Sequence, residues 1–189
     1  MAGAKPLSEA AQKELLKIAR KIIEAAAKGF RRPSCRPRGL PELTEVRGAF
    51  VTIYKRGQLR GCIGTFLPDR PVWQVVAEMA RSASRADPRF PPVSREELDE
   101  IDIEISVLSP LEKTDDPLSL ELGVHGIYIT RGMQSGTFLP QVATEHNMTK
   151  EEFLSTCCAH KAGLPPDAWK DPETEVYLYT AQVFGEKGG

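Results

Sequence analysis

The sequence predicts an α+β protein with an antiparallel β-sheet and flanking helices. Helical patterns occur between groups of β-hairpin patterns and do not follow every strand, which argues against a doubly wound parallel sheet. Residues 101–107 alternate Ile or Val with Asp, Glu and Ser, the clearest strand pattern in the chain. This alternation indicates a sheet with one buried face and one polar face.

The remaining elements follow from turn and cap residues. Two β-rich runs, 49–54 and 59–66, flank a four-residue turn pattern and predict a hairpin. Strand patterns also occur in 123–139 and 175–184. Ser8, Asp69, Ser94 and Thr149 are predicted to cap helices, the last two in capping boxes with Glu97 and Glu152. The Pro- and Arg-rich stretch 30–48 is predicted to be extended and exposed.

Composition limits the class of protein. With 189 residues, 41% of them hydrophobic and 27% charged, the chain suits one globular domain and is neither fibrous nor wholly disordered. No apolar run approaches the ~18–20 residues of a membrane helix, and the first residues lack the apolar core of a secretory signal. We therefore expect a cytoplasmic protein without membrane contacts. The four cysteines lack CxxC spacing and the three histidines form no HxH or HExxH pattern, so no metal or cofactor is expected.

Charge is distributed unevenly along the chain. Residues 1–70 contain fifteen Lys and Arg against six Asp and Glu, whereas the rest contains ten against twenty. One interpretation is that the two halves neutralise each other within the fold; the other is a basic surface for phosphate or nucleic acid around 28–38. The isoelectric point of 6.3 favours the first, because a dedicated nucleic-acid module is expected above ~9.

The most unusual segment is Leu59-Arg60-Gly61-Cys62-Ile63-Gly64-Thr65-Phe66. Two glycines within a strand indicate a bulge or the close approach of another group. Strand alternation places Arg60, Cys62 and Gly64 on one face, where Arg60 could favour the reactive thiolate and Gly64 could leave space above it. The alternative is a small buried cysteine between packing glycines.

Other candidate groups lie farther along the chain. His125, flanked by glycines at 123 and 126, could act as a base toward Cys62, although a lone histidine in a strand is more often structural. Asp102 and Glu104 share a strand face, which is more typical of a solvated surface than of a carboxylate pair. Sequence patterns for NTP hydrolysis, dinucleotide binding and serine hydrolysis are absent from the chain.

The sequence resembles the AMMECR domain family, whose bacterial members are called AmmeMemoRadiSam system protein A. The resemblance rests on five pieces in the same order: LRGCIGTF at 59–66, RFPP at 89–92, IEISVLSP at 103–110, GVHGI at 123–127, and LPQVA at 139–143 followed by Glu145. Met148 departs from the family pattern, in which bacterial relatives tend to have Trp.

The resemblance implies one domain over 8–184, made of a larger and a smaller subdomain, with 1–7 and 185–189 as flexible termini. It places the segment around Cys62 near a cleft and implies association with a Memo-like protein and a radical SAM protein. The resemblance supplies no activity.

Three hypotheses remain open at this point. The chain is an enzyme with Cys62 as nucleophile and His125 or Glu145 moving protons, or a binding module for a phosphate-bearing small molecule or nucleotide. In the binding module Arg60, Arg89 and the backbone at Gly61 and Gly64 hold the ligand. The third hypothesis is a non-catalytic adaptor or nucleic-acid-binding module. The first two predict that Cys62, Arg60, Arg89 and His125 line one pocket between the subdomains, and the distance from Cys62 to His125 distinguishes them.

Overall fold

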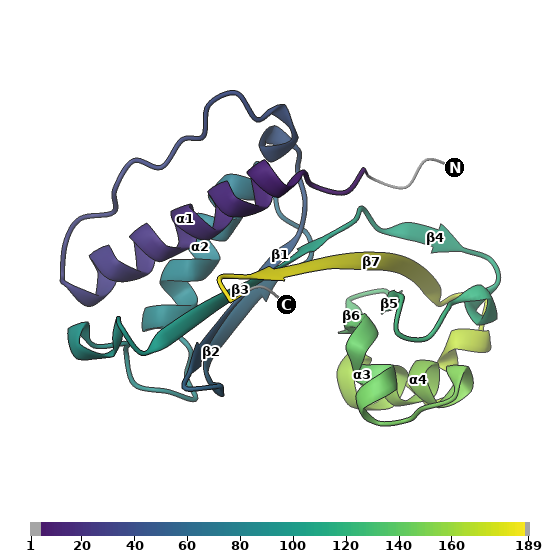
Figure 1. The fold of residues 1–189 in the computed structure, drawn as a ribbon. Helices are drawn as coiled ribbons and strands as arrows, with labels where there is room; N and C mark the ends of the chain where they lie inside the picture. The colour runs from purple at the N-terminus through teal and green to yellow at the C-terminus, as the bar shows by residue number, and fades with distance from the viewer. Residues whose placement is uncertain (1–4, 188–189) are drawn as a thin grey trace. The chain divides into compact units, whose positions relative to one another are not determined.

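The computed structural model describes residues 5–187, which divide into two units (Figure 1). The first unit contains the chain up to Leu108 and returns at Gln182, and the second extends from Ser109 to Ala181. Strand β7 (Glu175–Gly185) passes from the second unit into the first. The predicted α+β class is therefore confirmed.

In the first unit, two helices cover one face of an antiparallel sheet. The helices are α1 (Glu9–Ala27) and α2 (Val72–Arg85), and the strands are β1 (Ala49–Lys55), β2 (Gln58–Thr65) and β3 (Ile101–Leu108). The strand order is β2-β1-β3, followed by the end of β7. Short 3₁₀ turns η1 (Pro41–Thr44) and η2 (Arg95–Glu97) complete the unit. Strand β2 is therefore an edge strand.

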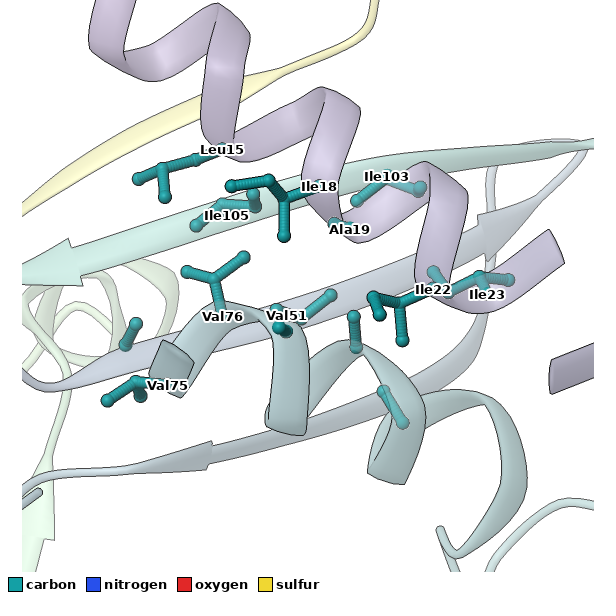
Figure 2. Close-up of a cluster of buried hydrophobic side chains, with 14 of the residues drawn as sticks. Leu15, Ile18, Ala19, Ile22, Ile23, Val51, Val75, Val76, Ile103 and Ile105 are labelled. Atoms are coloured by element: carbon teal, nitrogen blue, oxygen red, sulfur yellow. The ribbon is translucent and has the colours of Figure 1, made fainter. Parts of the chain in front are cut away.

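The core of the first unit lies between the two helices and this sheet. Figure 2 shows Ile18 and Ile22 of α1 and Val76 of α2 directed toward the strands. Val51 of β1 and Ile105 of β3 point back at them from the sheet, and all five side chains are buried. Burial on this scale contributes about 1.5–3 kcal/mol for each large aliphatic side chain. The polar residues that alternate with this core lie on the other face of the sheet.

The second unit is built in the same way on a smaller scale. Strand β7 pairs with β4 (Glu112–Thr114) and β5 (His125–Arg131), and β5 pairs with β6 (Gln134–Phe138), all antiparallel. Helices α3 (Pro140–Glu145) and α4 (Lys150–Cys157) precede a π-helical turn, η4 (Cys158–Ala162), which ends at Gly163 with φ +67°. Two 3₁₀ turns, η3 (Pro117–Ser119) and η5 (Ala168–Lys170), complete it. Phe138 and Phe153 stack in its core, with ring centroids 5.5 Å apart.

Most predicted caps are confirmed. The Ser8 hydroxyl accepts from the Ala11 N–H, and both capping boxes are formed. The Asp69 cap is wrong, because its carboxylate accepts from Arg70 Nε while α2 begins after Pro71 without a side-chain cap. Strand β4 was not predicted, since its Glu-Lys-Thr sequence has no apolar alternation.

The terminal segments expected to be flexible are partly inside the described residues. Leu7 is buried, and Glu186 binds Arg20 and the backbone N–H of Ile103. Residues 1–4 and 188–189 lie outside the described part of the chain. Among the helices that are described, none combines the length and the apolar composition needed to cross a membrane.

Candidate functional site

The predicted site segment forms the edge strand β2, and an irregularity in its pairing decides which side chains meet. Ile53 pairs with Gly61 and Tyr54 with Leu59, so Arg60 is an extra residue at a β-bulge. Cys62 and Gly64 stay on one face, opposite Thr52 and Phe50. The bulge therefore interrupts the predicted alternation at Arg60.

The outward edge of β2 at Cys62 is occupied by an aspartate and an arginine. Asp87 Oδ2 accepts from the Cys62 N–H at 2.9 Å, and Arg89 Nη2 donates to the Cys62 carbonyl at 3.3 Å. The same arginine binds both oxygens of Asp87, through Nε at 3.0 Å and Nη2 at 2.7 Å. Together, the two side chains take the place of a neighbouring strand and cover polar groups that an edge strand would otherwise expose.

The Asp87 carboxylate is an almost fully buried charge with complete hydrogen bonding. Its side chain is 2% exposed, and Oδ1 also accepts from the Arg89 N–H at 3.1 Å. The Arg89 guanidinium holds the pKa of Asp87 far below its usual range, although burial acts in the opposite direction. Such a pair fixes the position of both partners because either charge alone would be costly to bury.

A second ion pair holds Arg60. Glu97 accepts from Arg60 Nε at 3.0 Å and from Nη2 at 2.9 Å, a bidentate arrangement. Arg60 Nη1 donates to the Pro91 carbonyl at 2.9 Å, and the arginine side chain is only 12% exposed. Arg60, the Ser94 N–H and Lys55 together lower the pKa of Glu97 to about 2, against the opposing effect of burial.

Phe90 lies between these two pairs. Its ring centroid is 5.4 Å from Arg89 Cζ and 6.0 Å from Arg60 Cζ, within the range of cation–π contacts. The segment RFPP at 89–92 therefore links the two arginines through one aromatic ring and proline carbonyls. Its two prolines, together with Pro88, prevent helix formation and keep the carbonyls available as acceptors.

The Cys62 thiol lies on the polar face of the sheet and is half-buried. The Thr52 hydroxyl donates to its sulfur at 3.3 Å. Asp87 is the main cause of the raised pKa of Arg89, and Cys62 makes a smaller electrostatic contribution in the same direction. The sulfur therefore has a hydroxyl donor from β1 and a guanidinium cation within electrostatic range.

Both glycines of the segment have packing partners. A Cβ atom at Gly61 would lie 2.4 Å from the carbonyl oxygen of Ala83 in α2, and one at Gly64 would lie 2.2 Å from the Phe50 ring. The space that glycine leaves at position 64 is thus filled by Phe50. Close packing is a sufficient reason for both glycines, and a role in ligand binding stays a prediction.

His125 and Glu145 belong to the second unit, whereas Cys62, Arg60 and Arg89 belong to the first. His125 begins β5, and its Nδ1 accepts from the Glu121 N–H at 2.9 Å. A neutral ring with Nδ1 as acceptor carries its proton on Nε2, so it can donate there but has no free lone pair. Glu145 is exposed at the end of α3. Pairing of either residue with Cys62, and the shared pocket, stay predictions.

The other cysteines differ from Cys62 in their surroundings. Cys157 and Cys158 are buried at the junction of α4 and η4, and burial raises the pKa of Cys157 to about 12. Burial also raises the pKa of Cys158 and that of the half-buried Cys35. All four cysteines lie within the described residues, and among them Cys62 alone accepts a hydrogen bond from a hydroxyl group at its sulfur.

Comparison with known proteins identifies the family. The AMMECR1 family model matches residues 16–184. The chain belongs to the AMMECR1 family. A protein of Methanothermobacter thermautotrophicus is 47% identical over 190 residues, covering 97% of this chain and 98% of that protein. A protein of Nanoarchaeum equitans is 46% identical, covering 91% and 98% of the two chains.

The fold of this chain is also similar to a solved structure. The crystal structure of an uncharacterized protein from Pyrococcus horikoshii matches with a TM-score of 0.79 and 39% identity, covering 92% of this chain and 90% of that chain. The predicted family resemblance is confirmed. Neither this structure nor the relatives assign a ligand, a reaction or a partner to the chain.

Sequence reasoning missed the two carboxylates that organise the site. Asp87 is not among the candidate residues predicted from the sequence, and Glu97 is predicted only as part of a capping box, although each lies within a few residues of a proline-rich turn. A signal was available for Asp87, since Asp and Arg two residues apart in a non-helical segment can share one hydrogen-bonded turn. The hydrogen bond from Thr52 to Cys62 could not be predicted without the bulge, because regular pairing across the turn would place Thr52 opposite Gly61.

Proposed function

We propose that this AMMECR1-family chain binds a small anionic ligand beside Cys62, with the thiol as the reactive group and Arg89 as the anion-binding group. The observation that carries the proposal is that Arg89 is partly exposed and has one guanidinium nitrogen without a hydrogen-bond partner in the described chain. Its side chain is 53% exposed, and its bonds to Asp87 and to the Cys62 carbonyl use Nε and Nη2. The remaining Nη1 donates to no group among residues 5–187, so it is available to a carboxylate or phosphate oxygen.

Arg60, unlike Arg89, has no nitrogen free to bind the ligand. All three of its nitrogens are engaged by Glu97, Pro91 and Pro92. A ligand would have to break a mostly buried bidentate pair to reach Arg60, and the free energy of that pair would be lost. We therefore assign Arg60 to positioning the 89–92 segment, and Arg89 to contact with the ligand.

The reactive group is supported by its surroundings. Cys62 is half-buried, and its sulfur accepts a hydrogen bond from the Thr52 hydroxyl. Its backbone N–H donates to Asp87 and its carbonyl accepts from Arg89. A fixed thiol next to a cation suits reaction with, or close binding of, a small acid. A role in proton transfer for His125 and Glu145, which belong to the second unit, is a separate proposal; for His125 the available group is the Nε2–H donor, because Nδ1 accepts from the Glu121 N–H.

The test compares two alkylating reagents that differ mainly in charge. Iodoacetate and iodoacetamide both react by attack of the thiolate on carbon, forming an S–C bond as iodide leaves, but only iodoacetate presents a carboxylate. Peptide-resolved mass spectrometry would give the rate at each cysteine of the native protein. We expect the ratio of iodoacetate to iodoacetamide rates to be about tenfold higher at Cys62 than in a short unfolded peptide containing the same cysteine.

Variants separate charge from folding. Arg89→Lys keeps the charge and loses the planar fork, whereas Asp87→Asn/Arg89→Gln removes the buried carboxylate together with its partner. The double variant is expected to bring the ratio down to that of the peptide, and Arg85→Gln, an exposed arginine of α2, is expected to leave it unchanged. A wild-type ratio equal to that of the peptide would refute the proposed role of Arg89.

Association with a Memo-like protein and a radical SAM protein, implied by the family resemblance, is proposed as the setting in which this ligand is supplied or consumed. The alternative is a nucleic-acid-binding module or a non-catalytic adaptor, which would dock on partner proteins through the Pro- and Arg-rich segment 30–48 or through the acidic part of the chain. The adaptor hypothesis predicts that Cys62→Ser leaves partner binding intact. The ligand-binding hypothesis predicts that the same variant no longer retains the ligand.

A further inference from the structure

The segment after α1 carries a set of arginines without partners. Arg31, Arg32, Arg36 and Arg38 are all exposed, and none has an ion pair or a side-chain hydrogen bond anywhere in residues 5–187. No Asp or Glu occurs between positions 25 and 41. We call residues 30–39 the arginine strap.

Many other arginines of the first unit, by contrast, are paired with carboxylates. Carboxylates of the same unit bind Arg20, Arg47, Arg56, Arg60, Arg70 and Arg89. Arg81 and Arg85 of α2 also lack an ion pair among the described residues, but only the strap gathers four such arginines within eight residues of the described chain. Its charge is available to an external anion.

The strap is long and extended. It leaves the C-terminal end of α1 and returns to η1 beside the start of that helix, where the Ser8 hydroxyl donates to Glu42 at 2.6 Å (Figure 1). A helix of 19 residues is about 28 Å long. At ~3.4 Å per nucleotide that length corresponds to roughly eight stacked nucleotides, whereas a mononucleotide could reach only one or two of the arginines.

Aromatic surface accompanies the charge at both ends of the strap. Phe30 is 67% exposed at its beginning. At its end, Arg36, Pro37 and Leu40 line a groove of 790 Å³ together with Trp73, which is half-buried on α2. Guanidinium groups bind phosphates through a planar fork, and aromatic rings stack with any base. Charge alone would also suit an acidic protein. Carboxylates bind the cations without aromatic rings beside them, whereas the bases of a nucleic acid stack on such rings, and this favours nucleic acid.

We propose that the arginine strap and the Trp73 groove bind single-stranded nucleic acid, with phosphates on the four arginines and bases against Phe30 and Trp73. This surface is separate from the Cys62 site in its residues, and the proposal does not depend on that site. Because readout is by backbone charge and stacking, binding is expected to be tolerant of sequence.

Fluorescence anisotropy of the full chain with a labelled 12-nucleotide oligo(U) tests the proposal. Four phosphate contacts predict that the logarithm of the association constant falls with the logarithm of salt concentration with a slope of about −3. The variant with Arg31, Arg32, Arg36 and Arg38 all changed to Gln is expected to lose this slope. Arg36→Gln/Arg38→Gln is expected to weaken binding about tenfold at 50 mM salt.

The matched control is Arg81→Gln/Arg85→Gln, which removes two exposed arginines of α2 that also have no ion pair among the described residues. It is expected to change affinity by less than about twofold, since these positions lie outside the strap. Equal losses in the two double variants would overturn the proposal, because they would show attraction by total charge. All variants alter exposed side chains, and circular dichroism confirms that each is folded.

Stacking is tested separately through the indole. Oligo(U) is expected to quench tryptophan fluorescence in the wild type and not in Trp73→Phe, because Trp169 is buried in the second unit. Competition then distinguishes the occupants: a 12-base-pair duplex, UMP and a polyglutamate peptide are all expected to compete at least tenfold less well than oligo(U). Equal competition by polyglutamate would replace the nucleic acid with an acidic protein, and equal competition by UMP would replace it with a mononucleotide.

Discussion

The arginines at the edge of β2 and the arginines of the strap have opposite surroundings. Arg60 and Arg89 bind buried or mostly buried carboxylates, whereas Arg31, Arg32 and their neighbours at 36 and 38 are exposed and without ion pairs in the described chain. Buried pairing fixes a side chain and the backbone around it. An exposed cation contributes little to the fold and remains available to a ligand. The same residue type therefore builds the site in one place and offers charge in the other.

The largest expected effect is that of removing the buried carboxylate at the β2 edge. Asp87→Ala leaves Arg89 without its partner and the Cys62 N–H without an acceptor. We expect the free energy of unfolding to fall by about 3–5 kcal/mol, measured by urea denaturation at pH 7. The matched control, Asp69→Ala, breaks an exposed Asp–Arg pair and should leave the free energy of unfolding nearly unchanged. Equal losses in these two variants would contradict the comparison.

The next effect is an acid dependence of stability that originates at Glu97. Its pKa is lowered to about 2 in the folded protein from an ordinary value of 4.5. A lowered carboxyl pKa stabilises the fold above the ordinary value, and this stabilisation is lost as the pH falls toward the folded value. The expected loss between pH 5 and pH 2 is on the order of 3 kcal/mol.

Glu97→Gln removes the titrating group and isolates its contribution. The difference in unfolding free energy between wild type and variant should shrink steadily from pH 5 to pH 2 in urea titrations. A difference that is independent of pH over this range would show that Glu97 is not charge-paired in the folded protein.

A smaller effect is expected where charge is kept and geometry is changed. Arg60→Lys retains the cation but cannot make a bidentate pair with Glu97 and also reach the Pro91 carbonyl. We expect a loss of about 1–2 kcal/mol in urea denaturation. Arg56→Lys, at an exposed arginine paired with Glu100, is the control and should change stability by less than about 0.5 kcal/mol. A loss at Arg60 no larger than at Arg56 would refute the positioning role.

The smallest effect is predicted for the strap. Replacing its four arginines with Gln should change the free energy of unfolding by less than about 0.5 kcal/mol, because no intramolecular partner is lost. Thermal or urea denaturation at low salt checks this. A loss above about 1.5 kcal/mol would mean that the strap contributes to the fold through contacts of its arginines.

Much of the fold could be predicted from local patterns. The hairpin of β1 and β2, the alternation of β3 and two capping boxes are set by residues close in sequence, and all of them are confirmed. The Asp69 cap failed because Arg70, its immediate neighbour, competes for the same carboxylate. Strand β4 is held by pairing with β7 about sixty residues away, which no local pattern reports.

The site was predictable in its residue types but not in its pairings. The RGCIG segment and RFPP were recognised, yet the partners of Arg60 and Arg89 depend on a bulge at Arg60 and on a turn that folds Asp87 back toward β2. Both are tertiary features. Gly64 illustrates the same limit, since the sequence indicated space beside the thiol and the Phe50 ring occupies it.

The most direct test of the contrast between paired and free arginines is an NMR measurement of guanidinium motion. In a ¹⁵N-labelled sample, Arg60 and Arg89 are predicted to show restricted rotation of the guanidinium group and slow exchange of its protons with water. The strap arginines are predicted to show fast rotation and fast exchange, which oligo(U) slows while leaving Arg60 and Arg89 unchanged. If Arg60 and Arg89 move as freely as the strap arginines, the account of two differently used sets of arginines is contradicted.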